Sequence, residues 1–496
     1  MPWRGALMVC GTSSSAGKST VVAGLCRLLA RRGVDVAPFK AQNMSNNAAV
    51  CTDGAEIGRA QYAQALAAGV EPTADMNPVL LKPLDDRRAQ VVALGRPAGT
   101  VGAADYGDGH AARLELVLDA LGRLRRAHDV VVIEGAGSPA ELNLLERDVA
   151  NLPLACAARV PAIVVADVDR GGMLAAAYGT VALLPAHLRA CVRGFLVNRF
   201  RGDVGLLQPG LRTLEERTGL PVLGVLPHVD GAVDAEDSLD VPGRAGGADR
   251  TDAIRVAAIA TPRLSNFTDL EPIMAEPEVS VRFVQTPEGL HGADLIVLAG
   301  SRAVVDDLAW MRTRGFVDAL SRTDAVVLGI CGGYQMLGDS IRDPDGVESA
   351  TDVVDGLGLL PVTTTFDATK TTRIRRGEAF GAPVTGYEIR HGRPRRRDGD
   401  GWVHLDDEHG REHEGAYVDD RVFGTSVHGL FESDELRSAF LTWVACRRGR
   451  EFRPASIGFA DARRGFHDAL ADAIEAHTDV DRLLVIIASA DAGVLA

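Results

Sequence analysis

Residues 7–20 read Leu-Met-Val-Cys-Gly-Thr-Ser-Ser-Ser-Ala-Gly-Lys-Ser-Thr, an apolar run that breaks into a turn rich in glycine and serine. Amphipathic residues follow from Val21 to Arg32, so the stretch predicts a strand, a phosphate-binding loop and a helix. In such a loop, backbone N–H groups and the positive end of the helix converge on phosphate, and the lysine and serine side chains reach phosphate and magnesium. We therefore predict a nucleoside triphosphate site made by Gly11, Thr12, Gly17, Lys18, Ser19 and Thr20.

The spacing of this loop differs from the common one. Five residues separate Gly11 from Gly17, where the common phosphate loop has four, and Thr12 occupies the place of the usual first glycine. The alternative interpretation is a serine-rich turn after a buried strand. The flanking strand and helix patterns favour the phosphate loop.

Length and charge limit the class of protein. A chain of 496 residues should contain two or three domains of about 100–200 residues each. A hydrophobic content of 46% suffices for large cores, and a net charge of −14 argues against a nucleic-acid surface. We expect a protein that acts on small molecules, with no nucleic-acid partner.

The cysteine pattern and hydropathy bear on location. The chain has seven cysteines, an odd number, with no Cys-x-x-Cys pair, which favours a reducing compartment. The residues before the phosphate loop leave no room for a secretory signal, and no stretch approaches the about 18 apolar residues of a membrane span. We therefore expect a cytoplasmic protein without a membrane partner.

The first half alternates helical patterns with short runs rich in β-branched residues, which is typical of a parallel sheet covered by helices. Ligands of such sheets bind beyond the carboxyl ends of the strands. The predicted strands are Ala6 to Cys10, Val34 to Phe39, Val130 to Glu134, Ala162 to Asp167, Gly194 to Asn198 and Val222 to Leu226.

Polar residues follow several of these strands. Glu134 ends an apolar strand, where its carboxylate can bind magnesium directly or through water. Gln42 and Asn43 lie in a polar loop and are candidates for substrate binding, although an Asn-rich loop can also cap the next helix. Asn198 can hydrogen-bond an adenine edge or serve as a turn residue, and chemistry alone leaves both open.

The segment between His228 and Asp252 is rich in Asp, Gly and Pro, a composition that is typical of a linker. A second α/β pattern follows, with predicted strands at Ile254 to Ile259, Val281 to Val284, Leu295 to Ala299 and Val326 to Ile330. We predict an ATP-binding domain at 1–230, a linker at 231–252, a second α/β domain at 253–450, and a C-terminal helical segment and tail at 451–496.

A nucleophile elbow follows the last of these strands, in Gly-Ile-Cys-Gly-Gly-Tyr-Gln, residues 329–335. Cys331 would lie on a tight turn at a helix N-terminus, where the helix dipole favours a thiolate. We expect oxyanion donors from the amide of Gly332 and from the loop that contains Gly300. His428, in Thr-Ser-Val-His-Gly-Leu-Phe, is the candidate base.

Two charged stretches have less specific patterns. His404, His409 and His413 lie among acidic residues, but their spacing fits no standard metal-ligand set, so we expect an acidic, solvated hairpin. The basic run Arg393 to Arg397 precedes acidic residues and predicts a solvated loop.

These residues together carry a resemblance to the glutamine-hydrolysing cobyric acid synthases, a family of cobalamin biosynthesis, from Ala6 to about Leu484. The matching segments occur in order along both halves of the chain. They are Gly11 to Ser19, Gln42 to Met44, Glu56 to Gln61, Asn77 to Pro83, Glu134 to Glu141, Asp169 to Gly172, Phe200 to Asp203, Ile330 to Gly338, Gly386 to Ile389 and His428 to Phe431.

The resemblance implies a P-loop NTPase-like domain similar to dethiobiotin synthetase, followed by a class I glutamine amidotransferase domain. It implies a ligase that uses ATP, magnesium and glutamine to amidate the b, d, e and g carboxylates of adenosylcobyrinic acid a,c-diamide through an acyl phosphate. It further implies that Cys331 and His428 release ammonia from glutamine, and that Asp53 joins Ser19 and Glu134 in binding magnesium.

The chain departs from related patterns at two places. Ser15 stands where the family usually has an acid. Gly429 and Leu430 follow the histidine where most class I amidotransferases have Pro-Glu, so the third member of the catalytic set is not evident, and Glu432 or a water could substitute. The alternative functions are the sibling cobyrinic acid a,c-diamide synthase, and a nucleotide-switched scaffold ATPase with a decayed glutaminase domain.

Overall fold

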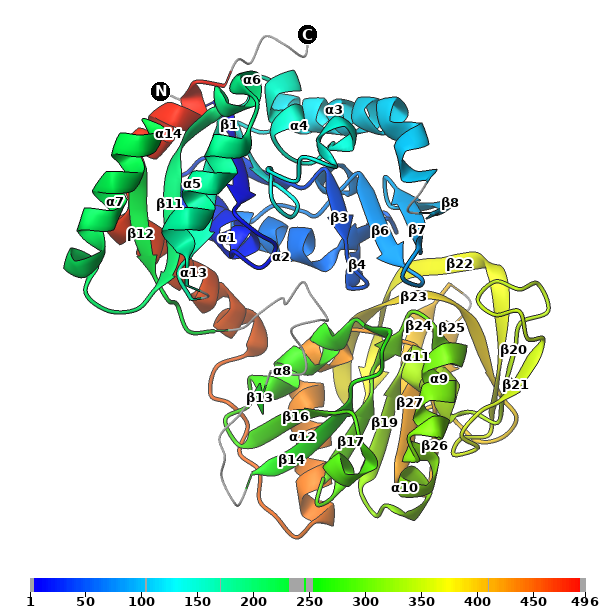
Figure 1. Cartoon of the computed structure of the whole chain (residues 1–496). Helices are drawn as coiled ribbons and strands as arrows, with labels where there is room; N and C mark the ends of the chain where they lie inside the picture. The colour runs from blue at the N-terminus through cyan, green and yellow to red at the C-terminus, as the bar shows by residue number, and fades with distance from the viewer. Residues whose placement is uncertain are drawn as a thin grey trace.

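The computed structural model describes residues 4–102, 105–169, 171–231, 245–246, 253–408 and 410–490. Arg170, His409, nearly all of the predicted linker and the end of the predicted tail therefore lie outside the described residues. The chain forms two lobes, one above the other in Figure 1: a first lobe of residues 4–231 and a second lobe of residues 253–447.

The first lobe is built on a parallel sheet in the order β12-β11-β10-β1-β9-β2. All six strands predicted in the first half belong to it. Their observed bounds are β1 Gly5–Gly11, β2 Val36–Phe39, β9 Val130–Glu134, β10 Ala162–Asp167, β11 Val192–Phe200 and β12 Val222–Pro227.

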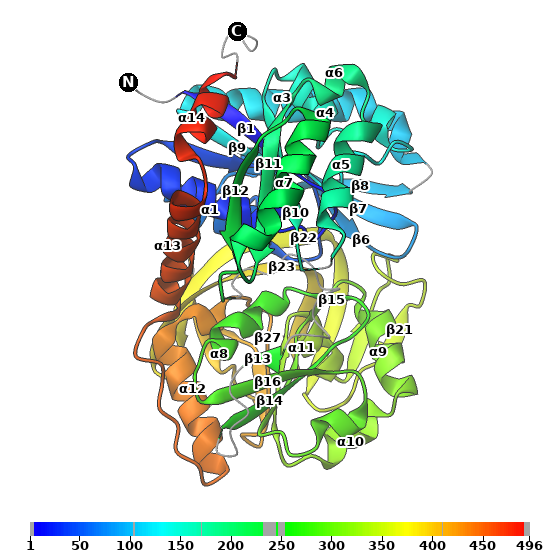
Figure 2. The ribbon, with the colours of Figure 1, turned by 60° about the vertical axis from the view of Figure 1, so that its left-hand side comes forward.

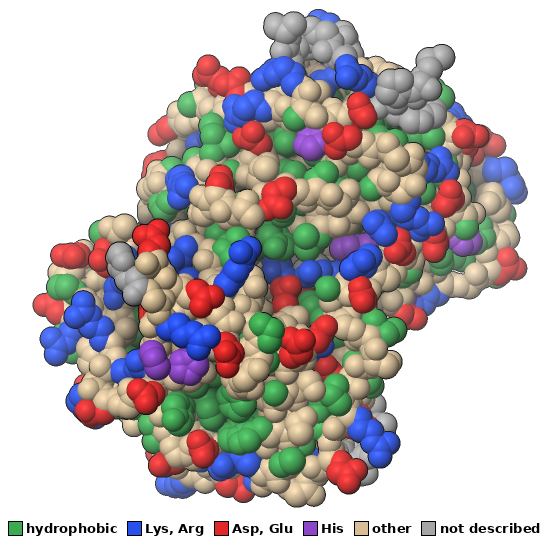
Figure 3. Space-filling model, turned by 180° about the vertical axis from the view of Figure 1, so that it is seen from behind, with side chains coloured by type: hydrophobic (Ala, Val, Ile, Leu, Met, Phe, Trp, Pro, Cys, Tyr) green, Lys and Arg blue, Asp and Glu red, His purple; other side chains and the backbone are tan. Residues whose placement is uncertain are grey.

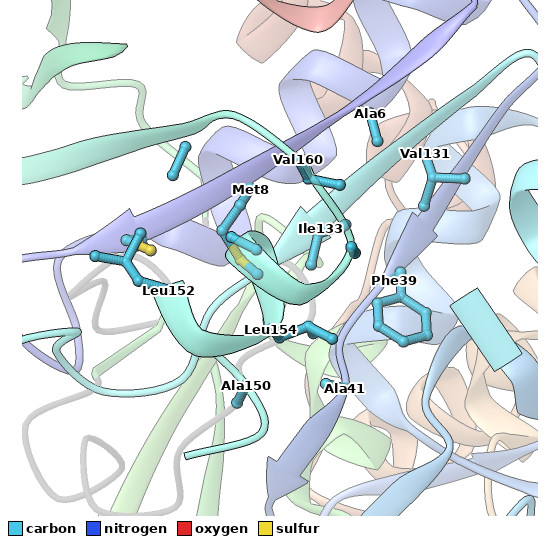
Figure 4. Close-up of a cluster of buried hydrophobic side chains, with 14 of the residues drawn as sticks. Ala6, Met8, Phe39, Ala41, Val131, Ile133, Ala150, Leu152, Leu154 and Val160 are labelled. Carbon is cyan, nitrogen blue, oxygen red and sulfur yellow. The ribbon is translucent and has the colours of Figure 1, made fainter. Parts of the chain in front are cut away.

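Helices cover both faces of this sheet because alternate residues of each strand point to opposite faces. Ala6 and Met8 of β1 pack with Leu152 and Leu154 on one face (Figure 4), whereas Leu7 belongs to the core on the other face. The helices of the first lobe are α1 Lys18–Arg31, α2 Arg59–Ala68, α3 His110–Ala127, α4 Leu152–Ala157, α5 Met173–Leu183, α6 Ala186–Arg189 and α7 Val204–Thr218.

The two C-terminal helices, α13 Phe459–His477 and α14 Val480–Ala488, return to the first lobe. Figure 2 shows α13 lying along α1, and Ile474 and Ile487 join the core on the α1 side of the sheet. Arg27 pairs with Asp468 at 2.7 Å across the two helices. The C-terminal segment therefore completes one face of the first sheet.

Smaller strands extend the first lobe toward the second. β3 Gln42–Met44, β6 Val79–Pro83, β7 Arg88–Ala93 and β8 Arg96–Gly102 form one sheet, and β4 Ala48–Val50 pairs with β5 Glu56–Gly58.

The second lobe contains a sheet in the order β13-β16-β14-β17-β19-β27-β26, in which the four predicted strands lie parallel at the centre. Its strands are β13 Ala245–Gly246, β14 Ile254–Ile259, β16 Val279–Val284, β17 Leu295–Leu298, β19 Val326–Ile330, β26 Ala416–Val418 and β27 Val422–Thr425. The helices around it are α8 Glu271–Met274, α9 Val304–Thr313, α10 Phe316–Arg322, α11 Gly332–Leu337 and α12 Asp434–Arg447.

A second, mostly antiparallel sheet contains two long strands that lie between the lobes in Figure 1. The prediction of a solvated loop at the basic run is wrong, because Arg393 to Arg396 belong to one of these strands, β23. The predicted acidic hairpin is confirmed, with His404 opposite His413. The strands are β20 Ser340–Arg342, β21 Val353–Asp355, β22 Val362–Ala379, β23 Ala382–Arg396, β24 Val403–Asp407 and β25 Gly410–Glu414. The short pair β15 Leu264–Ser265 and β18 Gly300–Ser301 lies apart from it.

A disulfide joins Cys156, in α4, to Cys191, just before β11. The spacing of the cysteines did not indicate it, and the cytoplasmic location inferred from that spacing stays a prediction. Among the described residues, no helix combines the length and the apolar character needed to cross a membrane. On the face seen in Figure 3, acidic and basic side chains are interspersed rather than separated by sign.

Candidate functional site

The predicted phosphate loop connects β1 to α1, and its shape depends on Gly17. Gly17 has a φ of +90°, and a Cβ atom there would lie 2.0 Å from Asn198 Nδ2. The Lys18 ammonium donates to the carbonyl oxygens of Ser13 at 2.9 Å and Gly137 at 3.0 Å. The amide of Thr12 donates to Val165 at the neighbouring strand. The loop is thus tied to β10 and to the segment that follows β9.

Glu134 lies at the base of this loop and is fully buried at the end of β9. Its Oε1 atom accepts hydrogen bonds from Ser19 Oγ and Lys40 Nζ, both at 2.8 Å, and its Oε2 atom accepts one from Gln64 at 2.5 Å. The structure therefore brings together two of the predicted magnesium ligands, Ser19 and Glu134.

These two residues fit a magnesium ion, because a hydroxyl and a carboxylate 2.8 Å apart supply the hard oxygen ligands that it prefers. Asp53 lies elsewhere, exposed in the turn between β4 and β5, where its carboxylate accepts from the Ala55 amide at 2.9 Å. Among the described residues, no group of three or more His, Cys, Asp or Glu side chains is arranged to hold a metal ion.

Asn198 and Arg199, at the end of β11, hold the outer side of the loop. Asn198 donates to the Ala16 carbonyl at 3.1 Å, and Arg199 donates to the Ser15 carbonyl and to Asp167, both at 2.9 Å. Because Asn198 lies inside a strand, the turn-residue alternative does not hold. It lines a pocket of about 120 Å³, which also contains Thr20, Pro227 and residues of α13.

The two substrate-binding candidates point to opposite sides of β3, as neighbours in a strand do. Asn43 is buried and donates to Gln61 Oε1 at 2.9 Å, whereas Gln42 is half-buried and accepts a hydrogen bond from the hydroxyl of Tyr106. Gln42 is thus the more accessible of the two.

The predicted elbow in the second lobe forms between β19 and α11. Cys331 has a φ of +52°, which is uncommon for a residue with a side chain, and its amide donates to Thr425 at 2.7 Å. Gly333 allows the turn to pack, because a Cβ atom there would lie 1.9 Å from the Leu298 carbonyl oxygen. The Cys331 side chain is buried and its sulfur lies 3.8 Å from the Ile389 carbonyl oxygen.

His428 lines the same pocket as Cys331, and the two side chains lie close enough to interact electrostatically. The Nδ1 atom of His428 lies 2.7 Å from Asp269 Oδ2, and the other oxygen of Asp269 accepts from the Gly429 amide at 2.7 Å. Burial alone would lower the pKa of His428, but Asp269 and Cys331 raise the pKa to about 10. These contacts favour an imidazolium beside the sulfur.

Asp269 occupies the place expected for the third member, which was not predicted from the sequence, and Glu432 was a wrong candidate for that place. Glu432 instead pairs with Arg59 of the first lobe at 2.8 Å and with Arg463 of α13 at 3.3 Å. The sequence did contain a signal for Asp269, because Ser265 to Asp269 is a polar stretch that follows β14. Parallel sheets bind ligands beyond the carboxyl ends of their strands, so a polar stretch after β14 is a position where a site residue is expected.

The two predicted oxyanion loops lie on the same side of the elbow. A Cβ atom on Gly300 would lie 3.2 Å from the His428 ring, and one on Gly332 would lie 2.6 Å from the Ser301 amide nitrogen. The structure therefore brings Gly300 and Gly332 together beside Cys331 and His428.

Both lobes line the pocket that contains Cys331 and His428, because Lys82 of β6 and Gln90 of β7 form part of its wall. Tyr387 of β23 stacks on His428 with ring centroids 5.4 Å apart, and its hydroxyl donates to the Ala48 carbonyl of the first lobe at 3.1 Å. The glutaminase-type site is thus built against the first lobe.

Comparisons with known proteins match both halves. A family model of the CobQ/CobB/MinD/ParA nucleotide binding domain matches residues 7–240, and one of the CobB/CobQ-like glutamine amidotransferase domain matches residues 255–436. The cobyric acid synthase of Mycolicibacterium gilvum is 52% identical over 487 residues, which cover 96% of each chain. That of Streptomyces coelicolor is 51% identical and covers 98% of this chain and 97% of its own.

The chain belongs to the cobyric acid synthase family.

Membership of the cobyric acid synthase family confirms the predicted α/β fold class, with a nucleotide-binding domain followed by a glutamine amidotransferase domain. It also confirms the prediction of a glutamine amidotransferase enzyme of cobalamin biosynthesis. The scaffold ATPase alternative does not account for relatives that match at about half identity through both halves.

Proposed function

We propose that this member of the cobyric acid synthase family amidates the b, d, e and g carboxylates of adenosylcobyrinic acid a,c-diamide, using ATP and glutamine, to give adenosylcobyric acid. The observation that carries the proposal is that Cys331 and His428, which is hydrogen-bonded to Asp269, share a pocket walled by a lobe that contains a phosphate loop. A thiol site for releasing ammonia and a nucleotide site for activating a carboxylate are the two parts that the reaction needs.

In the glutaminase half-reaction, the Cys331 sulfur attacks the side-chain carbonyl carbon of glutamine and forms a tetrahedral intermediate. Amides of Gly332 and the Gly300 loop donate hydrogen bonds to the oxyanion. His428 transfers its proton to the departing nitrogen, so that ammonia leaves and a glutamyl thioester remains. Water then hydrolyses the thioester, releasing glutamate and restoring the thiol.

In the synthetase half-reaction, a carboxylate oxygen of the corrinoid attacks the γ-phosphorus of ATP, and ADP leaves. Lys18 and the amides of the loop stabilise the charge on the phosphoryl oxygens. Ammonia then attacks the acyl phosphate, inorganic phosphate leaves, and the amide forms. A magnesium ion held by Ser19 and Glu134 would neutralise phosphate charge. The pocket beside Thr20 and Asn198 is the candidate site for the adenine base.

The lobes support the predicted division into domains at 1–230 and 253–450. The packing of α13 and α14 on the first sheet supports adding the C-terminal segment to the first domain.

Isotope labelling tests the proposed chemistry. The enzyme is incubated with ATP, amide-labelled [15N]glutamine and a corrinoid a,c-diamide whose free carboxylates carry 18O. We expect 15N in the four new amides and 18O in the released phosphate, because the phosphoryl group takes one carboxylate oxygen. Absence of 18O from the phosphate would overturn the acyl phosphate, and amidation at a and c of an unamidated corrinoid would favour the sibling reaction.

A further inference from the structure

The pocket of Cys331 and His428 contains charged groups that the proposed reaction does not use. Arg302, Lys370 and Arg390 line it, together with Lys82 of the first lobe. Among the described lining residues, Glu348 is the only carboxylate. Lys82 and Lys370 pair with Glu56, and Arg390 pairs with Glu388. Arg302 and Glu348 are therefore the remaining pair of opposite charges in this wall, and such a pair suits a ligand that carries both charges.

Glu348 lies in the segment between β20 and β21, and its Oε1 atom accepts at 3.1 Å from the Val305 amide at the start of α9. Burial raises the pKa of Glu348 to about 7, although the Val305 amide and Arg302 oppose that change. When burial raises the pKa of a half-buried carboxylate, a nearby cation stabilises its charged form and compensates for the lost water.

The side chain of Arg302 lines the pocket and contacts the first lobe. Its NH2 atom donates to Gln90 Oε1 at 3.1 Å, while its buried Nε atom has no partner among the described residues. Burial lowers the pKa of Arg302, although Glu348 opposes that change, so the two groups lie close enough to interact. An unused N–H donor on a half-buried guanidinium suits a carboxylate ligand.

Gln335, on α11 just after the elbow, gives an independent indication of a polar ligand. Its side chain is 2% exposed and lines the pocket, and its Oε1 atom has no hydrogen-bond partner among the described residues. Buried polar atoms of this kind are uncommon and call for a partner.

We propose that Glu348 and Arg302 bind the α-amino and α-carboxylate groups of an L-α-amino acid whose side chain reaches Cys331, and that Gln90 of the first lobe positions Arg302. The inference rests on the proposed glutaminase function and specifies how that site recognises glutamine. It makes recognition of the amino acid dependent on both lobes.

The test compares two substrates on the full chain: L-glutamine and glutaramate, which is glutamine without the α-amino group. In the wild type, we expect kcat/KM to favour L-glutamine by about 10- to 100-fold, the worth of a hydrogen bond between charged groups. In Glu348→Gln, kcat/KM for L-glutamine should fall to near the glutaramate value, with glutaramate hydrolysis changed less than about 3-fold. Arg302→Met should lower kcat/KM for both substrates by about 10- to 100-fold.

Asp479→Asn is the matched control, because Asp479 also caps a helix but lies on α14. It should leave the substrate ratio unchanged. If Glu348 only caps α9, Glu348→Gln will keep the wild-type ratio, and that result overturns the inference while leaving the proposed function intact. If the wild type hydrolyses neither substrate, both fail together.

Gln90→Leu tests the contribution of the first lobe. We expect KM for L-glutamine to rise about 5-fold or more with kcat within about 2-fold, because the variant loosens Arg302 without touching Cys331. Synthesis driven by ammonium should stay at the wild-type rate in the control Asp479→Asn. An unchanged KM in Gln90→Leu would overturn the positioning role.

Discussion

At the scale of single residues, the thiol site depends on three side chains that lie far apart in the sequence. Local sequence patterns indicated two of them: a glycine-rich turn after a strand indicated Cys331, and a polar stretch around a histidine indicated His428. Asp269 is 159 residues from His428, and only a polar stretch in the sequence around it indicated a site residue. Its hydrogen bond fixes the imidazole tautomer and orientation, which is the role of the third group in comparable catalytic sets.

Asp269→Asn should shift the pH dependence of glutaminase activity. Asp269 is a main reason that the pKa of His428 is raised to about 10, so removing its charge should lower that pKa. The alkaline fall of kcat/KM, where the imidazolium loses its proton, should then move to lower pH. We also expect kcat to fall about 10²- to 10⁴-fold. A pH profile of glutamine hydrolysis measures both effects.

Glu432→Gln is the matched control, since Glu432 lies close to His428 in sequence but pairs with Arg59 and Arg463. It should leave the alkaline limb in place. A shift in Glu432→Gln, or none in Asp269→Asn, would contradict the assignment of Asp269.

At the scale of elements, buried parallel strands were predictable, whereas the two long, half-exposed antiparallel strands β22 and β23 were not. β9, β10, β14 and β19 have the predicted bounds because strands covered on both faces are continuous apolar runs. β22 and β23 are rich in Thr and Arg and are only partly buried, so their pattern resembled loops. The contacts of Asn198 with the phosphate loop also depend on packing that no local pattern reveals.

The turn from β1 to α1 gives a prediction about glycine. Gly17→Ala should weaken binding of ATP by about 10-fold or more, because the new methyl group would collide with Asn198 and force the loop to move. Calorimetric titration with a non-hydrolysable ATP analogue measures the effect.

Gly33→Ala is the control for backbone strain alone. Gly33 has a φ of +77° but open space around it, so its substitution should cost about 1–2 kcal/mol of stability and leave ATP affinity unchanged. Equal losses of ATP affinity in both variants would contradict the steric role of Gly17.

At the scale of the whole molecule, buried charge joins the lobes beside the shared pocket. Glu56 of β5 is fully buried, and it pairs with Lys82 at 2.6 Å and with Lys370 of β22 in the second lobe. Burial alone would raise the pKa of Glu56, but the two lysines lower the pKa to about 2. Local patterns did not predict this contact, or the return of α13 to the first lobe, because both join segments that are distant along the chain.

Lys370→Met should lower the stability of the assembled chain by about 2 kcal/mol, since Glu56 loses one of its two buried partners. Because the pKa of Glu56 is lowered, the charged pairing contributes fully above pH 4.5, the ordinary value, and is lost as the pH falls toward 2. Burial lowers the pKa of Lys370 to about 8, so the pairing is also lost as the pH rises above that value. Calorimetric unfolding at neutral pH measures the loss.

Arg411→Met is the matched control, because it removes an exposed pairing of Arg411 with Glu378 at 3.4 Å. It should change stability by less than about 1 kcal/mol. A control variant as unstable as Lys370→Met would contradict a special role for the buried contact between the lobes.

The most direct test of the two-site account measures corrinoid amidation with glutamine and with ammonium in two variants. Cys331→Ala should abolish synthesis from glutamine and retain synthesis from ammonium, because only the source of nitrogen is lost. Lys18→Ala should abolish both, because activation of the carboxylate needs the phosphate loop. Loss of ammonium-driven synthesis in a folded Cys331→Ala enzyme, or its survival in Lys18→Ala, would contradict the account.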